Sequence, residues 1–87
     1  MALVVEFTCD LPNGVHARPA SYVETLCNSF TSQIEWHNLR SGRKGSAKSA
    51  LALIGTDTLA GDVCRLIITG TDEQEAHQHL EKWLKEE

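Results

Sequence analysis

A tight turn leads directly into a helix at Pro12-Asn13-Gly14-Val15-His16-Ala17-Arg18-Pro19-Ala20. Asn13-Gly14 is a strong turn signal, because glycine adopts backbone conformations that other residues avoid. Pro19 is tolerated only in the first turn of a helix, where its missing N–H would have no intrahelical partner. The helix therefore begins near His16, and this histidine lies at its N-terminus.

The alternation of apolar and polar residues predicts the strands on either side of this helix. Strands are predicted over residues 3–8, around 34–37 and over 63–69. The Gly/Ser-rich segment 41–46 predicts a hairpin turn into a further short strand. Four strands follow from these patterns.

Three helices are predicted between and after the strands. Apolar residues at helical spacing continue as far as Phe30 in the first helix. The second is short, over residues 50–54, with Ser49 or a neighbouring serine as its cap, and the third opens with a capping-box pattern at Thr71 and Gln74. The order β-α-β-β-α-β-α indicates an α+β fold, a two-layer open-faced sandwich with three helices on one face of a four-stranded antiparallel sheet. A ferredoxin-like module is the nearest competitor.

Length and composition favour one domain over residues 1–87. A chain of 87 residues that is 41% hydrophobic has little room to enclose a substrate, so we expect an exposed reactive residue. Cys9, Cys27 and Cys64 form no Cys-x-x-Cys pair and are interpreted as reduced core thiols. Without a signal peptide or a long apolar run, the chain is expected to be cytoplasmic, with no membrane insertion.

Charge is unevenly distributed along the sequence. The net charge of −4 argues against nucleic-acid binding. Residues 36–56 nevertheless contain no acidic residue and carry four basic ones, namely Arg40, Arg43, Lys44 and Lys48. Two interpretations stay open, a solvated loop or a surface that steers acidic partners.

The chemistry suggested by His16 is phosphoryl transfer. A helix N-terminus presents free amide groups and partial positive charge, which stabilise a phosphate group. Neutral imidazole is a good nucleophile toward phosphorus, and a phosphorylated imidazole releases its phosphoryl group readily. Arg18 supplies a planar set of donors for the transferring group. A helix cap or an ordinary surface histidine is the alternative interpretation.

The eight residues Asn13 to Ala20 resemble the active-site motif of the HPr phosphocarriers of the bacterial sugar phosphotransferase system. A second segment, Ala47-Lys48-Ser49, is similar to the start of the family's second helix. The resemblance extends over essentially the whole chain. Relative to the common pattern, the 41–46 hairpin is about two residues longer, and Trp36-His37 is an unusual end to the second strand. These departures make an HPr-like module of a multiphosphoryl transfer protein as reasonable as a free carrier.

The resemblance implies roles for particular residues. His16 would accept a phosphoryl group at Nδ1 from enzyme I, ultimately from phosphoenolpyruvate, and pass it to a sugar-specific enzyme IIA-type acceptor. Arg18 would assist the transfer. No metal or organic cofactor is implied, and the module would be a monomeric carrier rather than a self-sufficient enzyme. The resemblance makes Ser49 a possible regulatory site, because part of the family is phosphorylated on a serine in this segment, but we favour a role as a helix cap.

The second helix suggests a docking surface. Its apolar residues exceed what one core contact requires. We expect Leu53 to face the sheet, with Leu51 and Ile54 exposed as a partner-docking patch and Lys48 beside them. Complete burial of a tilted helix is the alternative.

Two other functions compete with phosphoryl transfer. In the first, His16 and Arg18 hold a phosphate or an acidic peptide without covalent transfer. In the second, the chain binds nucleic acid, which the acidic balance disfavours.

Overall fold

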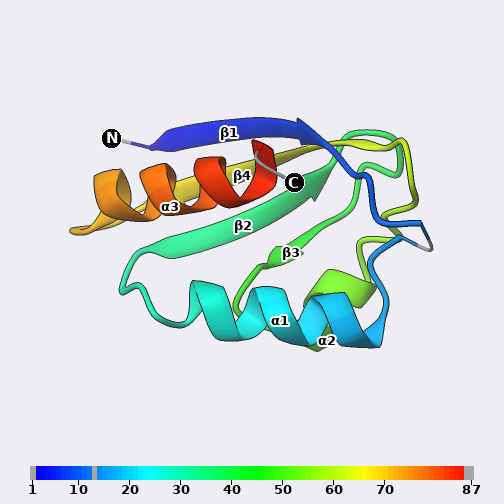
Figure 1. Ribbon diagram of the computed structural model, residues 1–87, viewed down its shortest axis with the longest axis horizontal. Coiled ribbons are helices and arrows are strands. Elements are labelled where there is room, and N and C mark those ends of the chain that lie inside the picture. Colours follow the sequence, from blue (N-terminus) through cyan, green and yellow to red (C-terminus); the bar gives the residue numbers. More distant parts are fainter. Residues whose placement is uncertain (1, 13, 86–87) are drawn as a thin grey trace.

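The computed structural model describes residues 2–12 and 14–85 (Figure 1). Seven elements follow one another in the predicted order β-α-β-β-α-β-α. They are β1 (Leu3–Thr8), α1 (Ala17–Cys27), β2 (Gln33–Asn38), β3 (Lys44–Ser46), α2 (Ala50–Ile54), β4 (Val63–Thr69) and α3 (Glu73–Lys85). Of the helices described, none has the length and apolar character needed to cross a membrane.

The four strands form one antiparallel sheet in the order β1-β4-β2-β3. Leu66 of β4 pairs with Val5 of β1 on one side and with Trp36 of β2 on the other. All three side chains are buried, whereas their strand neighbours, such as Glu6 and Arg65, are exposed. Helices therefore cover only one face of the sheet, as predicted. The central position of β4 excludes a ferredoxin-like sheet, in which the first and third strands are neighbours.

The core lies between that face and the three helices. Each helix contributes an apolar stripe. The buried helical residues are Ala20, Val23 and Cys27 of α1, Leu53 of α2, and Ala76 and Leu80 of α3. Cys9, Cys27 and Cys64 are buried free thiols. Burial raises the pKa of Cys27 to about 12 and that of Cys64 to about 11, so neither is an available nucleophile.

The first helix ends earlier than the spacing of its apolar residues predicts. The helical spacing continues to Phe30, but α1 ends at Cys27, after which the N–H groups of Ser29 and Phe30 bond the carbonyls three residues back, Leu26 O and Cys27 O, at 3.2 Å each. The side-chain amide of Asn28 donates to Glu24 O at 2.8 Å, and Lys48 Nζ donates to Phe30 O at 2.6 Å. Phe30 still enters the core, from the turn that follows the helix.

The start of α3 also differs from the prediction. The capping-type bond runs from the Gly70 N–H to Glu73 Oε1 at 3.0 Å, one residue earlier than a Thr71–Gln74 box. The Thr71 hydroxyl instead lies 3.2 Å from the Thr31 hydroxyl. Asp72 accepts the backbone N–H groups of Thr31 and Ser32, each at 2.9 Å, and also bonds the Ser32 hydroxyl. These bonds, led by that of the Ser32 hydroxyl, lower the pKa of Asp72 to about 2.

Replacing Asp72 with asparagine is expected to remove an acid-sensitive part of the stability. The folded-state pKa of Asp72 lies below its ordinary value, so its contribution is full above pH 4 and is lost as the pH falls toward about 2. Urea unfolding should therefore show Asp72→Asn less stable than the native chain at pH 7, with the gap closing in acid. Glu75→Gln makes the same charge change near the same helix end and should keep the native pH dependence. An equal gap at pH 7 and pH 2.5 would contradict the assignment.

Candidate functional site

His16 is the N-cap residue of α1, as the sequence predicted. Its backbone is extended, with φ −119° and ψ −168°, and its carbonyl accepts the Ala20 N–H at 2.9 Å. The side chain is exposed and makes no capping hydrogen bond. The imidazole is therefore held at the helix end by the backbone alone, and capping occupies neither ring nitrogen.

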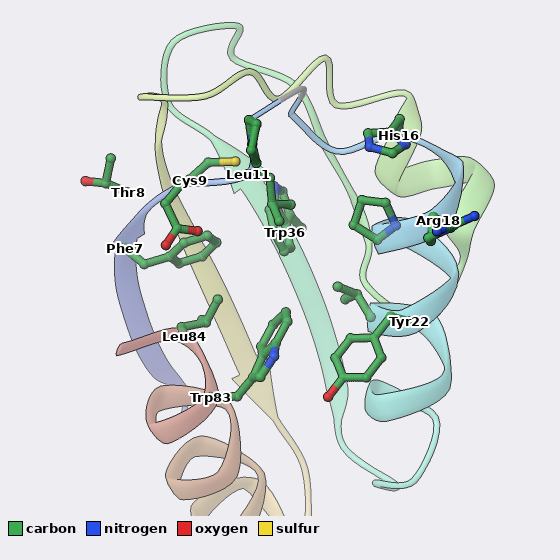
Figure 2. Close-up of a pocket in the computed structure, with 14 residues that line it drawn as sticks. Phe7, Thr8, Cys9, Leu11, His16, Arg18, Tyr22, Trp36, Trp83 and Leu84 are labelled. Atoms are coloured by element: carbon green, nitrogen blue, oxygen red, sulfur yellow. The ribbon is translucent and has the colours of Figure 1, made fainter. Parts of the chain in front are cut away.

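The surroundings of His16 favour an anion. The first turn of α1 contains no acidic residue, and Pro19 has no N–H to satisfy. The remaining N–H groups of this turn have no partner within the helix and point outward, and they carry the partial positive charge of the helix N-terminus. Arg18 is exposed at the same helix end, and none of the ion pairs found among the described residues involves it (Figure 2). The arrangement can receive a phosphate group beside a free imidazole.

The loop before His16 lies directly on the segment that follows α2. The Val15 N–H donates to Thr58 O at 3.0 Å, and the Gly14 N–H donates to Leu11 O at 2.9 Å. Gly14 has a φ of +71°, and a Cβ atom there would lie 2.2 Å from Thr58 O. Only glycine permits this approach. Asn13, the other residue of the predicted turn, lies outside the described residues.

The second helix presents the expected apolar surface. Ser49 caps α2, since its hydroxyl accepts the Ala52 N–H at 3.2 Å. Leu53 is fully buried, whereas Leu51 is 81% exposed and Ile54 is 41% exposed. We call Leu51 and Ile54 the α2 patch. Its contact with a partner stays a prediction.

The basic stretch is less available than its composition suggests. Arg40 Nε donates to Asp62 Oδ1 at 2.8 Å, and its Nη2 lies 3.2 Å from Asp57 Oδ2. The charge of Arg40 is therefore partly offset by acidic residues of a distant loop, and the two interpretations of the basic stretch stay open. Lys48 is half-buried with its ammonium on Phe30 O, so any part it plays in docking would be through charge alone.

A groove next to His16 was not predicted. It has a volume of about 470 Å³ and lies between the end of β1, α1 and the last turn of α3 (Figure 2). Phe7 and Trp36 meet edge to face along it, with ring centroids 4.9 Å apart. Tyr22 of α1 and Trp83 of α3 flank the groove, with their ring centroids 5.5 Å apart. The exposed position of Tyr22 on α1 was the available signal, but the two aromatic residues are far apart in the sequence.

The chain is similar to known proteins over most of its length. A family model described as PTS HPr component phosphorylation site matches residues 4–86. Over its full 87 residues the chain is 78% identical to part of multiphosphoryl transfer protein 2 of Escherichia coli (strain K12), and covers 10% of that protein. It is 36% identical over 77 residues to the HPr-like protein Crh of Bacillus subtilis (strain 168), with 88% of each chain covered.

A solved structure supports the same architecture. The crystal structure of a phosphocarrier protein HPr from Bacillus anthracis str. Ames superimposes with a TM-score of 0.83, covering 97% of this chain and 98% of that one. The sequence identity is 24%, so this likeness concerns the fold. The chain spans about a tenth of the length of the multiphosphoryl transfer proteins that it matches.

Substitution of Gly14 should be far more costly than substitution of Gly42. Both have a φ near +70°, but a Cβ at Gly42 has nothing within 4 Å. Gly42→Ala should therefore cost only the conformational penalty of about 1 kcal/mol. Gly14→Ala adds a clash with Thr58 O, and we expect a loss of roughly 3 kcal/mol in the free energy of unfolding. Urea titrations of the two variants measure the difference, and equal losses would show that the loop moves aside freely.

Proposed function

This chain belongs to the HPr family of the phosphotransferase system, and on that premise we propose that His16 is the residue that carries the phosphoryl group. The domain is a phosphocarrier of that system. The observation that supports His16 is its position as an exposed N-cap residue at the N-terminus of α1, with Arg18 exposed in the first turn of the same helix.

The transfer step follows from this geometry. An unprotonated nitrogen of His16, Nδ1 in our proposal, attacks the phosphorus of a phosphohistidine on the donor. A nitrogen–phosphorus bond forms on His16 as the one on the donor breaks, so the donor imidazole is the leaving group. The α1 N-terminus and Arg18 stabilise the negative charge of the phosphoryl oxygens. The reverse steps pass the group to the acceptor.

The partners are proposed from the family. Enzyme I would be the donor, with phosphoenolpyruvate as the ultimate source, and an enzyme IIA-type protein the acceptor, both in the cytoplasm. The α2 patch borders α1, because the two helices pack together, and would contact both partners in turn. Residues 1–87 would act as one carrier domain, either with a separate donor or with one in the same polypeptide. Ser49 would serve as the cap of α2 rather than as a regulatory site.

Loss of His16 should abolish phosphorylation. After incubation with phosphoenolpyruvate and an HPr-type enzyme I, intact mass should show one acid-labile phosphoryl group on the native chain. His16→Ala should show none, while His37→Gln, on the open face of the sheet, should be labelled normally. A folded native chain that gains no mass with any enzyme I tested would favour non-covalent phosphate or acidic-peptide binding. Persistent labelling of His16→Ala would place the phosphoryl group elsewhere.

Removal of Leu51 should weaken docking and leave the chemistry intact. Leu51→Ser should raise the KM for this chain in the enzyme I reaction about tenfold, which corresponds to about 1.4 kcal/mol of lost contact. Its stability should change little, because Leu51 is 81% exposed. Val4→Ser removes an exposed apolar side chain from the open face and should leave the KM unchanged. A native KM for Leu51→Ser would show that Leu51 of the α2 patch does not contribute to docking of enzyme I.

A further inference from the structure

A chain of buried polar groups connects β2 to α2 beneath the His16 loop. Trp36 Nε1 donates to the Thr58 hydroxyl at 3.1 Å. The Thr58 and Thr56 hydroxyl oxygens are 2.8 Å apart, and the Thr56 hydroxyl donates to Leu53 O at 2.7 Å. Trp36, Thr56 and Thr58 are each no more than 2% exposed, so water does not compete for these bonds.

The direction of every hydrogen in this chain is fixed by its two ends. An indole N–H only donates and a carbonyl oxygen only accepts. The Thr58 hydroxyl therefore accepts from Trp36 and donates to Thr56, which donates to Leu53 O. Thr58 is the one member that both accepts from β2 and donates toward α2.

The same residue supports the His16 loop through its backbone. Thr58 O accepts the Val15 N–H at 3.0 Å, and Gly14 packs onto that oxygen too closely for any side chain. Val15 precedes His16 directly. A movement of Thr58 is therefore transmitted to the imidazole through a single residue.

The segment that holds Thr58 is itself clamped. Asn38 Nδ2 donates to the carbonyl oxygens of Thr56 and Asp57, each at 3.2 Å. Arg40 Nη2 donates to Asp57 O at 2.6 Å, and the Leu59 N–H donates to Asp62 Oδ2 at 2.9 Å. These bonds flank Thr58 on both sides. The Thr58 hydroxyl adds a further tie from this segment to the sheet, through Trp36 of β2.

We propose that Thr58 is a positioning residue for phosphoryl transfer. Its hydroxyl is held between Trp36 and Thr56, and its carbonyl oxygen fixes the position of the His16 loop by accepting the Val15 N–H. This inference rests on the proposed role of His16. It also gives a role to Trp36 within β2, since this indole supplies the donor that fixes Thr58. Transfer rates depend steeply on such placement, because a displacement of about 1 Å can cost on the order of a hundredfold.

Thr58→Val tests the proposal, because valine keeps the shape of threonine and removes the hydroxyl. The donor is phosphoramidate, a small molecule that needs no docking surface. A nitrogen of His16 attacks phosphorus, the phosphorus–nitrogen bond of the donor breaks, and ammonia leaves with a proton from water. We expect the labelling rate to fall about tenfold in Thr58→Val and to stay within twofold of native in Thr58→Ser. Amide exchange at Val15 should rise only in the valine variant.

Ile68→Val serves as the control for general destabilisation. It shortens a buried side chain at the opposite end of β4, where Ile68 pairs with Leu3 and Ile34. Its labelling rate and Val15 exchange should match the native chain under conditions where all variants are folded. A native rate with a protected Val15 amide in Thr58→Val would overturn the proposal, as would equal slowing in Ile68→Val. If the native chain accepts no phosphoryl group at all, the role of His16 fails first, and the positioning role fails with it.

Discussion

A chain of this size can bury only one face of its sheet, and the remaining architecture depends on that constraint. The three helices all lie on the side defined by Val5, Trp36 and Leu66, and the other face stays open to solvent. The core is consequently one layer thick and is filled by sheet and helix side chains together. The groove of about 470 Å³ at the edge of this core opens beside His16 rather than enclosing it, so the reactive group is presented at the surface.

Surface presentation creates a difficulty of its own, since an exposed side chain has few neighbours to hold it. In this structure, backbone contacts hold the residue in place. His16 is placed by the first turn of α1 and by the Val15 N–H on Thr58 O. The side chains that reinforce this placement are buried below the loop and never reach the imidazole. The imidazole of His16 is thus exposed at the surface, while the bonds that hold its loop in place are buried beneath it.

Local sequence signals were sufficient to predict the order of the helices and strands. They did not predict the contacts between segments that are distant in the sequence. Pro19 and Gly14 located the start of α1, and Ser49 capped α2 as expected. The end of α1 was missed because periodicity does not show where the backbone tightens into the turn at Ser29 and Phe30, where Lys48 from a distant segment binds Phe30 O. The family motif indicated His16 directly.

The same distinction explains what was missed around the site. The partners of Arg40 lie on a loop remote in sequence, so composition alone did not reveal these ion pairs. The bond between Trp36 and Thr58 has the same origin, since neither residue type predicts the other. A threonine in the segment Gly55-Thr56-Asp57-Thr58 gives no sign that it will support a loop until the sheet is assembled.

The surfaces on either side of His16 also suit a carrier that must leave each partner quickly. The α2 patch offers two exposed aliphatic side chains, Leu51 and Ile54. An apolar contact of this size is far smaller than the core of a stable protein–protein interface. Affinity differences between related complexes lie mainly in the dissociation rate, so a small patch favours short-lived complexes. A larger apolar surface would bind a donor more tightly and delay the second half of the proposed transfer.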